Sequence, residues 1–308
     1  GEERVLSSRG LVNAAGPWVQ SLLGREMGRT SPRGIRLIKG SHLVVPRIHD
    51  QEEAFILQNE DGRIVFVIPY LERFSIVGTT DVEHHGSPET AKISAEEIDY
   101  LCNVVNRHFT RQLNPADVLW SYSGVRPLCD DESSSVQAIT RDYTVELEVE
   151  GGAPLLSVFG GKLTTYRKLS EAVMGKLAPF YPHMGASWTA TAQLPGGNIG
   201  QDVLAFANKL RETYPFLSPE TSRRLATTYG SKASCMLGKA ESLADLGHDF
   251  GSQFTQKEID YLLKHEFAVT AEDLLWRRTK MGLFLAPEAR QAVADYVERR
   301  AVRHLAAA

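Results

Sequence analysis

The stretch LLSVFGGKLTTYRKLSEAVMGKL, Leu155–Leu177, decides the fold. Its apolar run ends at two glycines, Gly160 and Gly161, and a helical pattern follows. Apolar residues then recur three, four and four positions apart on one helix face, at Tyr166, Leu169, Val173 and Leu177. This pattern predicts a strand, a glycine corner and a helix. The unpaired N–H groups and the helix dipole at such a corner favour a negatively charged ligand.

A second corner with the same order of features lies in LVNAAGPWVQSLL, Leu11–Leu23. A short apolar strand leads to Gly16, and Pro17 suits the first turn of a helix. Two strand–glycine–helix corners predict a layered α/β sheet against which a flat cofactor lies. Each corner is equally compatible with a tight turn in which the glycines only supply a positive φ.

Composition excludes several classes of protein. The chain has 308 residues, a net charge of −4 and a pI of about 6.2, which disfavours a nucleic-acid-binding protein. Three cysteines without a CxxC pair predict neither a disulfide framework nor a zinc site, and no HxxxH or HExxH motif predicts another metal site. A reducing cytoplasm fits this cysteine content. We identify no signal peptide and no apolar run of about 18 residues.

The residues between 35 and 160 predict a mixed or antiparallel sheet, because β-branched and aromatic segments alternate with turn residues. One helix interrupts the strands, and Ser94 with Glu97 has the spacing of a capping box at its start. No Gly-x-Gly-x-x-Gly or Walker A motif occurs, so any dinucleotide cradle lies outside this chain.

The chain after residue 200 predicts a small helical bundle. A polar bridge rich in Gly and Pro, residues 179–200, precedes it and predicts a domain boundary. The capping-box spacing recurs at Thr255 with Glu258 and at Thr270 with Asp273. Pro287 suits the first turn of the last helix.

Arginine and histidine provide the candidates for chemistry. Arg126, in SYSGVRPLCDDES, is a natural clamp for a phosphate or carboxylate, although a salt bridge to Asp130, Asp131 or Glu132 explains it equally well. Arg141 is a second candidate clamp, with a structural pair to Asp142 or a glutamate as the alternative. His42 lies mid-strand in IKGSH, where a structural hydrogen-bonding histidine is the simpler interpretation. Asp81 ends a strand and more often caps a turn than reacts.

The motifs in this order resemble FAD-dependent, aerobic, membrane-associated glycerol-3-phosphate dehydrogenases over nearly the whole chain. The matching stretches are LVNAAGPWV, GIRLIKGSHLVVPR, FVIPY, FSIVGTTDVE, SYSGVRPLCDDES, AITRDY, LLSVFGGKLTTYRKLSE, DLGHDFG and LWRRTKMGL. The family begins with a glycine-rich Rossmann unit that holds the ADP half of FAD. The resemblance therefore implies a C-terminal fragment that lacks this unit.

The resemblance implies an α+β and α/β fold class: a mixed substrate-binding sheet, remnants of an FAD-binding domain and a C-terminal all-α domain. The implied limits are 1–34 for the FAD-domain remnant, 35–153 for the β-rich substrate domain, 154–180 for the return to the FAD domain and 181–308 for the helices. FAD is the implied cofactor, weakly bound or absent in the fragment. It would lie against Ala15, Gly16, Pro17, Trp18, Gly160, Gly161, Lys162, Leu163 and Thr164.

The family's reaction oxidises sn-glycerol 3-phosphate to dihydroxyacetone phosphate and passes electrons to quinone. By resemblance, Arg126 and then Arg141 are the substrate-binding residues that clamp the phosphate. His42 is the expected base and Lys162 the expected positive charge near the flavin, and the two roles are interchangeable at this stage. No metal is implied.

Two other functions remain open from the sequence. The chain alone is compatible with a catalytically inactive module that binds substrate at most and self-associates. An amine or amino-acid oxidase of the same flavoprotein fold is a weaker alternative. The resemblance implies a cytoplasmic enzyme on the inner face of the membrane, and an exposed strand edge at Leu11–Ala15 suggests a homodimer. Basic residues between Trp276 and His304 fit a solvated helix face, or a contact with anionic lipid or a partner subunit.

Overall fold

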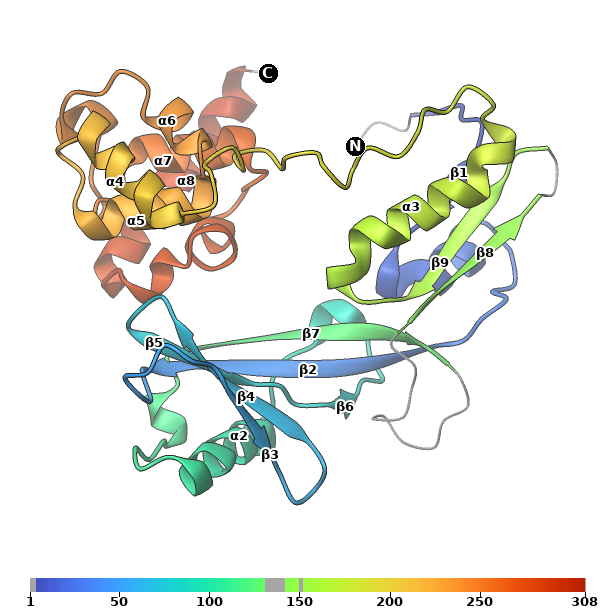
Figure 1. Cartoon of the computed structure of the whole chain (residues 1–308), viewed down its shortest axis with the longest axis horizontal. Helices are drawn as coiled ribbons and strands as arrows, with labels where there is room; N and C mark the ends of the chain where they lie inside the picture. The colour runs from blue at the N-terminus through green and yellow to red at the C-terminus, as the bar shows by residue number, and fades with distance from the viewer. Residues whose placement is uncertain (1–3, 131–141, 150–151, 308) are drawn as a thin grey trace. The chain divides into compact units, whose positions relative to one another are not determined.

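The computed structural model describes residues 4–130, 142–149 and 152–307. The chain divides into two compact units, Gly1–Ala190 and Thr191–Ala308, and each is described here by itself. Figure 1 shows strands with covering helices in the first unit and helices in the second. The α+β class with a C-terminal helical domain is thereby confirmed. The finer limits at residues 34, 153 and 180 stay predictions.

The larger sheet of the first unit is antiparallel throughout and is built around one long strand. Its central strand β2 pairs with β5 and β6 along one edge and with β7 along the other. The order is β3-β4-β5-β2-β6, with β7 on β2. The strands are β2 (Ile35–Pro46), β3 (Phe55–Gln58), β4 (Ile64–Tyr70), β5 (Phe74–Gly78), β6 (Val82–Glu83) and β7 (Trp120–Cys129).

Helix α2 (Ala95–His108) covers one face of this sheet, below it in Figure 1. The predicted capping box is present, because Ser94 accepts a hydrogen bond from the Glu97 N–H and Glu97 accepts one from the Ser94 N–H. The apolar stripe of the helix packs on alternate residues of the strands in one cluster, which includes Leu43, Val45, Val65, Val67, Val77, Leu101, Val104 and Val105. The opposite face of the sheet is therefore left for the site.

The smaller sheet has the order β1-β9-β8, with β1 (Leu11–Asn13) parallel and β8 (Tyr143–Glu148) antiparallel to β9 (Leu155–Gly160). Helix α3 (Tyr166–Leu177) packs on one face through Val173 and Leu177. Three short helices, η1 (Gly16–Trp18), α1 (Val19–Ser21) and η2 (Leu22–Glu26), follow β1. Val19 of α1 and Leu23 of η2 pack with Phe159 in one apolar cluster. This arrangement confirms the expected strand–glycine–helix corners.

Short 3-10 helices join these elements of the first unit: η3 (Pro88–Thr90), η4 (Pro115–Asp117), η5 (Leu163–Thr165) and η6 (Ala178–Phe180). Strand β1 forms one edge of its sheet, and Leu11 and Val12 are both more than two-fifths exposed there.

The second unit is helical and has its own apolar core, in which Phe254, Ile259 and Leu274 are fully buried. Its α-helices are α4 (Val203–Thr213), α5 (Pro219–Tyr229), α6 (Lys232–Leu237), α7 (Gln256–His265) and α8 (Pro287–Ala307). Shorter helices are η7 (Leu243–Leu246), η8 (Asp273–Arg278) and η9 (Met281–Leu283). Among the described residues, no helix has both the length and the apolar character needed to cross a bilayer.

All three predicted helix starts in the second unit are confirmed, but one of the two predicted capping boxes does not form. Pro287 begins α8, and Thr270 and Asp273 exchange the reciprocal bonds of a capping box. Thr255 precedes α7, but its side chain makes no capping bond. Glu258 instead accepts hydrogen bonds from Arg224 and from the Tyr229 hydroxyl. A buried ion pair outweighs the local capping interaction here, because an unpaired guanidinium in this core would cost more than a missing cap.

Candidate functional site

His42 and Arg126 lie on the same face of the larger sheet, opposite α2. In the register of β2 and β7, His42 is opposite Tyr122, Gly40 opposite Gly124, and Arg126 opposite Ile38. Alternate residues of a strand share a face, and directly paired residues of neighbouring strands share it too. The structure therefore brings together two of the predicted site residues, which are 84 positions apart in the sequence (126 minus 42).

Arg126 is held from two directions. Its Nη1 pairs with an Asp81 carboxylate oxygen, and its Nη2 donates to the Thr79 hydroxyl over 3.1 Å. The sequence offered Asp130, Asp131 or Glu132 as salt-bridge partners, of which the last two lie outside the described residues. It did not pair Arg126 with Asp81, for which a turn cap was considered more common than a functional role. No local signal identifies this pair, because the register of separate strands brings it together. Since a guanidinium has five N–H donors, these bonds leave others for an anion.

His42 is held by packing. Its ring stacks on Tyr122 with centroids 4.8 Å apart and an angle of 6° between the planes. Its Nδ1 is buried, and no described residue hydrogen-bonds to it. Burial lowers the pKa of His42, and the nearby charge of Arg126 lowers it further. The imidazole is therefore neutral at neutral pH, as a proton acceptor must be.

Two glycines make room for these side chains. A Cβ at Gly78 would lie 2.4 Å from His42 Cδ2, and a Cβ at Gly40 would lie 2.6 Å from Arg126 Nη2. A Cβ at Gly124, directly across from Gly40, would meet nothing within 4 Å. Strands β2 and β5 thus carry no side chain at Gly40 and Gly78, where Arg126 and His42 pack against the backbone.

A buried polar cluster lies behind this face, between β2 and α2. Glu97 accepts hydrogen bonds from Ser41 at 3.2 Å and Thr80 at 2.6 Å, and its second oxygen pairs with Lys39 at 2.7 Å. Ser41 also lies 2.9 Å from the Ser123 hydroxyl. Burial acts to raise the pKa of Glu97, but bonds from Lys39, Thr80 and the Ser94 N–H outweigh it and lower that pKa. The sequence identified Glu97 only as a helix cap and missed this cluster.

The two glycine corners lie beside each other. Strands β1 and β9 are parallel neighbours, so their carboxyl ends meet at one edge of the smaller sheet. Gly160 and Gly161 have φ values of +73° and +97°, and Gly16 has +56°, which confirms positive φ at these corners. A Cβ at Gly160 would lie 3.6 Å from the Pro127 carbonyl oxygen. The corner at Gly160 and Gly161 therefore packs next to the strand residue that follows Arg126.

The helix starts at these corners carry no side-chain caps, at η1, at η5 or at α3. The residues predicted to hold the cofactor line both corners: Ala15, Gly16, Pro17, Trp18, Gly160, Gly161, Lys162, Leu163 and Thr164. Trp18 donates its indole N–H to Glu89 over 2.8 Å, yet 43% of it stays exposed, and Leu163 is 89% exposed. Two exposed apolar side chains and uncapped N–H groups would suit a flat, negatively charged ligand.

Two predicted site residues are less well defined. Lys162 is exposed, and its ammonium group has no hydrogen-bond or ion-pair partner within the described part of the chain. Arg141 lies outside the described residues, so its role as a phosphate clamp stays a prediction. The described residues contain no group of three or more His, Cys, Asp or Glu side chains suited to a metal ion.

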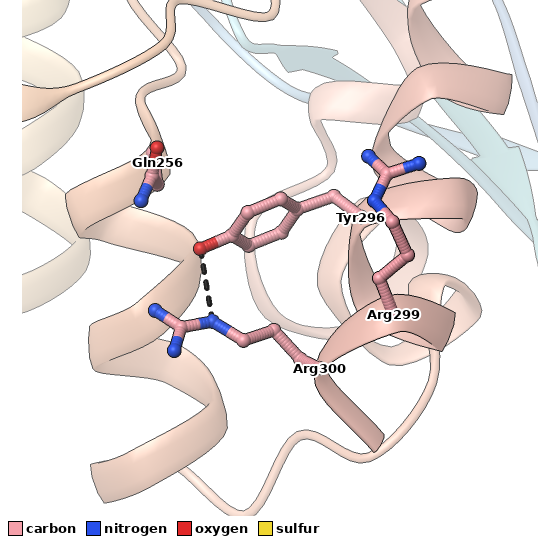
Figure 2. A pocket seen from close by; sticks show the side chains of 4 residues that line it. All are labelled: Gln256, Tyr296, Arg299 and Arg300. Atoms are coloured by element: carbon pink, nitrogen blue, oxygen red, sulfur yellow. Dashed lines mark hydrogen bonds between the residues drawn. The ribbon is translucent and has the colours of Figure 1, made fainter. Parts of the chain in front are cut away.

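A polar hollow of about 290 Å³ lies in the helical unit, and none of the residues that line it is a predicted site residue (Figure 2). Gln256, Tyr296, Arg299 and Arg300 line it. Arg300 donates to the Tyr296 hydroxyl over 3.0 Å and pairs with Asp260, so its charge is already compensated. This arrangement ties α8 to α7.

Comparison with known proteins identifies both units. Residues 1–167 match the family described as FAD dependent oxidoreductase, and residues 187–303 match the C-terminal domain of alpha-glycerophosphate oxidase. The chain is 54% identical over 298 residues to the aerobic glycerol-3-phosphate dehydrogenase of Escherichia coli K12, covering 96% of this chain and 60% of the relative. It is 43% identical to D-erythritol 1-phosphate dehydrogenase of Brucella abortus, covering 97% of this chain and 60% of that protein.

A solved structure agrees with these sequence matches. The glycerol-3-phosphate dehydrogenase from Bacillus halodurans, solved in complex with FAD, superposes with a TM-score of 0.75 at 26% identity, over 96% of this chain and 62% of that one. The chain thus spans about 60% of the length of the Escherichia coli and Brucella abortus relatives. Because the first family profile covers more than half of its 308 residues, the chain belongs to the FAD dependent oxidoreductase family.

Proposed function

We propose that this chain forms the substrate-binding and helical parts of a flavin-dependent glycerol-3-phosphate dehydrogenase, which oxidises sn-glycerol 3-phosphate to dihydroxyacetone phosphate. One observation carries the proposal: Arg126 and His42 share a sheet face, next to a glycine corner suited to a cofactor. The chain is similar to proteins that carry this name in Escherichia coli, Pseudomonas aeruginosa and Bacillus halodurans.

The two glycine corners fit FAD. Gly160 and Gly161 have the positive φ that lets bare backbone approach a ligand, and the α3 start is uncapped. Trp18 and Leu163 are exposed apolar side chains at the same corners and suit a flat ring. Bound FAD supplies the acceptor for the hydride that leaves C2 of the substrate. Lys162, whose charge is uncompensated within the described residues, would stabilise negative charge on the reduced cofactor.

Arg126 is the proposed phosphate clamp. The carboxylate of Asp81 and the hydroxyl of Thr79 fix its guanidinium, which keeps further N–H donors for the phosphate oxygens. Preorganisation of this kind lowers the entropy lost on binding, because the side chain is already in place. Arg141 is the second proposed clamp.

His42 is the proposed base for the C2 hydroxyl proton. Its lowered pKa leaves the ring neutral, and Tyr122 stacking fixes its plane. A neutral ring that accepts the proton at Nε2 already carries its own hydrogen on Nδ1, and no described residue accepts a hydrogen bond from that nitrogen. A comparison of His42→Ala with Lys162→Ala distinguishes this assignment from the reverse one, in which Lys162 is the base. The variant that has lost the base should no longer show the pH dependence of kcat.

The same proposal extends to the cellular setting. Electrons would pass from the enzyme to quinone at the inner face of the cytoplasmic membrane, with the protein bound peripherally. The resemblance supports this extension, as do the basic side chains Arg277, Arg278 and Arg299 of the helical unit. Pairing of the exposed β1 edge in a homodimer is proposed on the same footing.

The test is a visible absorption spectrum recorded before and after anaerobic addition of glycerol 3-phosphate. It uses the holoenzyme, meaning the FAD-loaded chain, or this chain in place of the matching part of the Escherichia coli relative if the chain alone stays colourless. Bleaching of the flavin bands in wild type, and its loss in Arg126→Ala, is the expected result. Bleaching by an amine or amino acid, with none by glycerol 3-phosphate, would replace the proposed substrate. A flavin-loaded protein that no substrate bleaches would leave only an inactive module.

A further inference from the structure

We propose that Glu97 is a positioning residue for the site: from the far side of the sheet, its carboxylate fixes the backbone segments that carry His42 and hold Arg126. The inference deepens the proposed function and rests on it for the roles of those two residues. Glu97 itself touches neither substrate nor cofactor face, since it belongs to α2.

Both carboxylate oxygens of Glu97 are fully used. One accepts from the hydroxyls of Ser41 and Thr80, which are both 0% exposed, and the other accepts from Lys39 and from the Ser94 N–H at 2.8 Å. Four donors therefore converge on one buried carboxylate. A glutamate that only caps the helix needs just the bond from the Ser94 N–H. The bonds from Ser41, Thr80 and Lys39 therefore require another explanation.

Each hydroxyl is next to a residue of the site. Ser41 precedes His42 in β2 and also contacts Ser123 of β7, which joins the two central strands behind the face. Thr80 lies between Thr79 and Asp81, the residues that hold Arg126. Its hydroxyl also accepts from the Ser41 N–H at 3.0 Å, and its own N–H donates to the Ser41 carbonyl at 3.3 Å.

The negative charge is needed as well as the shape. In Glu97→Gln, one amide oxygen must serve donors on both sides of the side chain. Its NH2 group would then face either the Lys39 ammonium and Ser94 N–H or the Ser41 and Thr80 hydroxyls. The first orientation sets donors against donors, and the second forces both hydroxyls to turn their hydrogens away and accept instead, so in either case the segment with Thr80 shifts.

The experiment measures kcat/KM for glycerol 3-phosphate and the melting temperature in the holoenzyme. Glu97→Gln changes the acceptor of the Thr80–Glu97 hydrogen bond and Thr80→Val removes its donor, whereas Thr80→Ser keeps a hydroxyl at that position. Ser94→Ala is the matched control, because it weakens the cap of α2 and leaves the Ser41 and Thr80 hydroxyls in place. We expect Glu97→Gln and Thr80→Val to lose about tenfold or more in kcat/KM, mostly through KM, as a displaced clamp would. Thr80→Ser and Ser94→Ala should stay within about twofold of wild type.

The inference is overturned if Thr80→Val and Glu97→Gln melt lower, like Ser94→Ala, yet keep wild-type kcat/KM. Wild type that fails to oxidise glycerol 3-phosphate would instead remove the proposed function. A crystal structure of Thr80→Val tests the positioning role separately from the proposed function, because it does not depend on enzyme activity. A guanidinium of Arg126 that leaves Thr79 supports the positioning role, and an unmoved one refutes it.

Discussion

Replacing Gly40 with alanine should displace Arg126 while leaving the sheet intact. The new methyl group would lie 2.6 Å from Arg126 Nη2, 2.7 Å from Thr79 Oγ1 and 3.0 Å from Arg126 Cζ. Favourable contacts between such atoms need about 3.5 Å or more, so the guanidinium must move by about 1 Å. The atoms that must move belong to side chains, and the backbone of β2 can stay in register.

The expected loss of activity is large, and the expected change in stability is small. A misplacement of about 1 Å in a binding group can lower kcat/KM by about a hundredfold. Stability gains about 0.4–1 kcal/mol because alanine restricts the unfolded chain, and the displaced Arg126 contacts offset part of that gain. Activity and melting temperature should therefore separate in this variant.

The matched control is Gly124→Ala. Gly124 is directly opposite Gly40 on β7, and its φ is likewise outside the left-handed range, but an added Cβ would meet nothing within 4 Å. Steady-state kinetics on the holoenzyme and thermal melts of both variants provide the comparison. The reasoning is refuted if Gly40→Ala keeps a kcat/KM equal to that of Gly124→Ala, or if it melts far below it.

Three further predictions concern other parts of the molecule. His42→Ala should lower kcat far more than it raises KM. Because the pKa of His42 is lowered, wild-type kcat should fall only at a pH below the usual histidine value of 6.5, where the base takes up a proton. A pH–rate series checks this. Hydrogen bonds from Ser187 and Thr189 lower the pKa of Glu171 to about 2, so its stabilising effect is present above pH 4.5 and is lost as the pH falls toward 2. Glu171→Gln should therefore show a weaker acid-induced drop in melting temperature than wild type. Arg224→Met leaves Glu258, whose side chain is 2% exposed, without its cation and should cost about 3–5 kcal/mol in urea unfolding.

Local patterns in the sequence predicted much of the fold. The glycine corners at Gly16 and Gly160, the capping box of α2 and the start of α8 at Pro287 all depend on residues within one turn of each other. Such features can be predicted from the sequence because the backbone geometry of a few neighbouring residues determines them. The local patterns also singled out Arg126, Arg141, His42 and the glycine corners as candidates, and the resemblance then supplied their expected roles.

Local patterns could not predict the contacts between side chains that are far apart in the sequence. Asp81 holds Arg126 across 45 positions, and Glu97 receives Lys39 from β2 and Thr80 from the segment between β5 and β6. Only the register of β2 with β6 and β7 brings these groups together. The wrong capping box at Glu258 has the same origin, since Arg224 comes from another helix.

The capping box of α2 links helix formation to the order of the sheet. Glu97 ends the first turn of the helix and holds Ser41 and Thr80 with the same carboxylate. Fraying of that first turn would release strand β2 behind His42 and the 79–81 segment that holds Arg126 in one event. Amide hydrogen exchange at the start of α2 and in the 79–81 segment should then follow a single opening free energy. The precision of the binding face would thus depend on the thermal motion of one helix end on its far side.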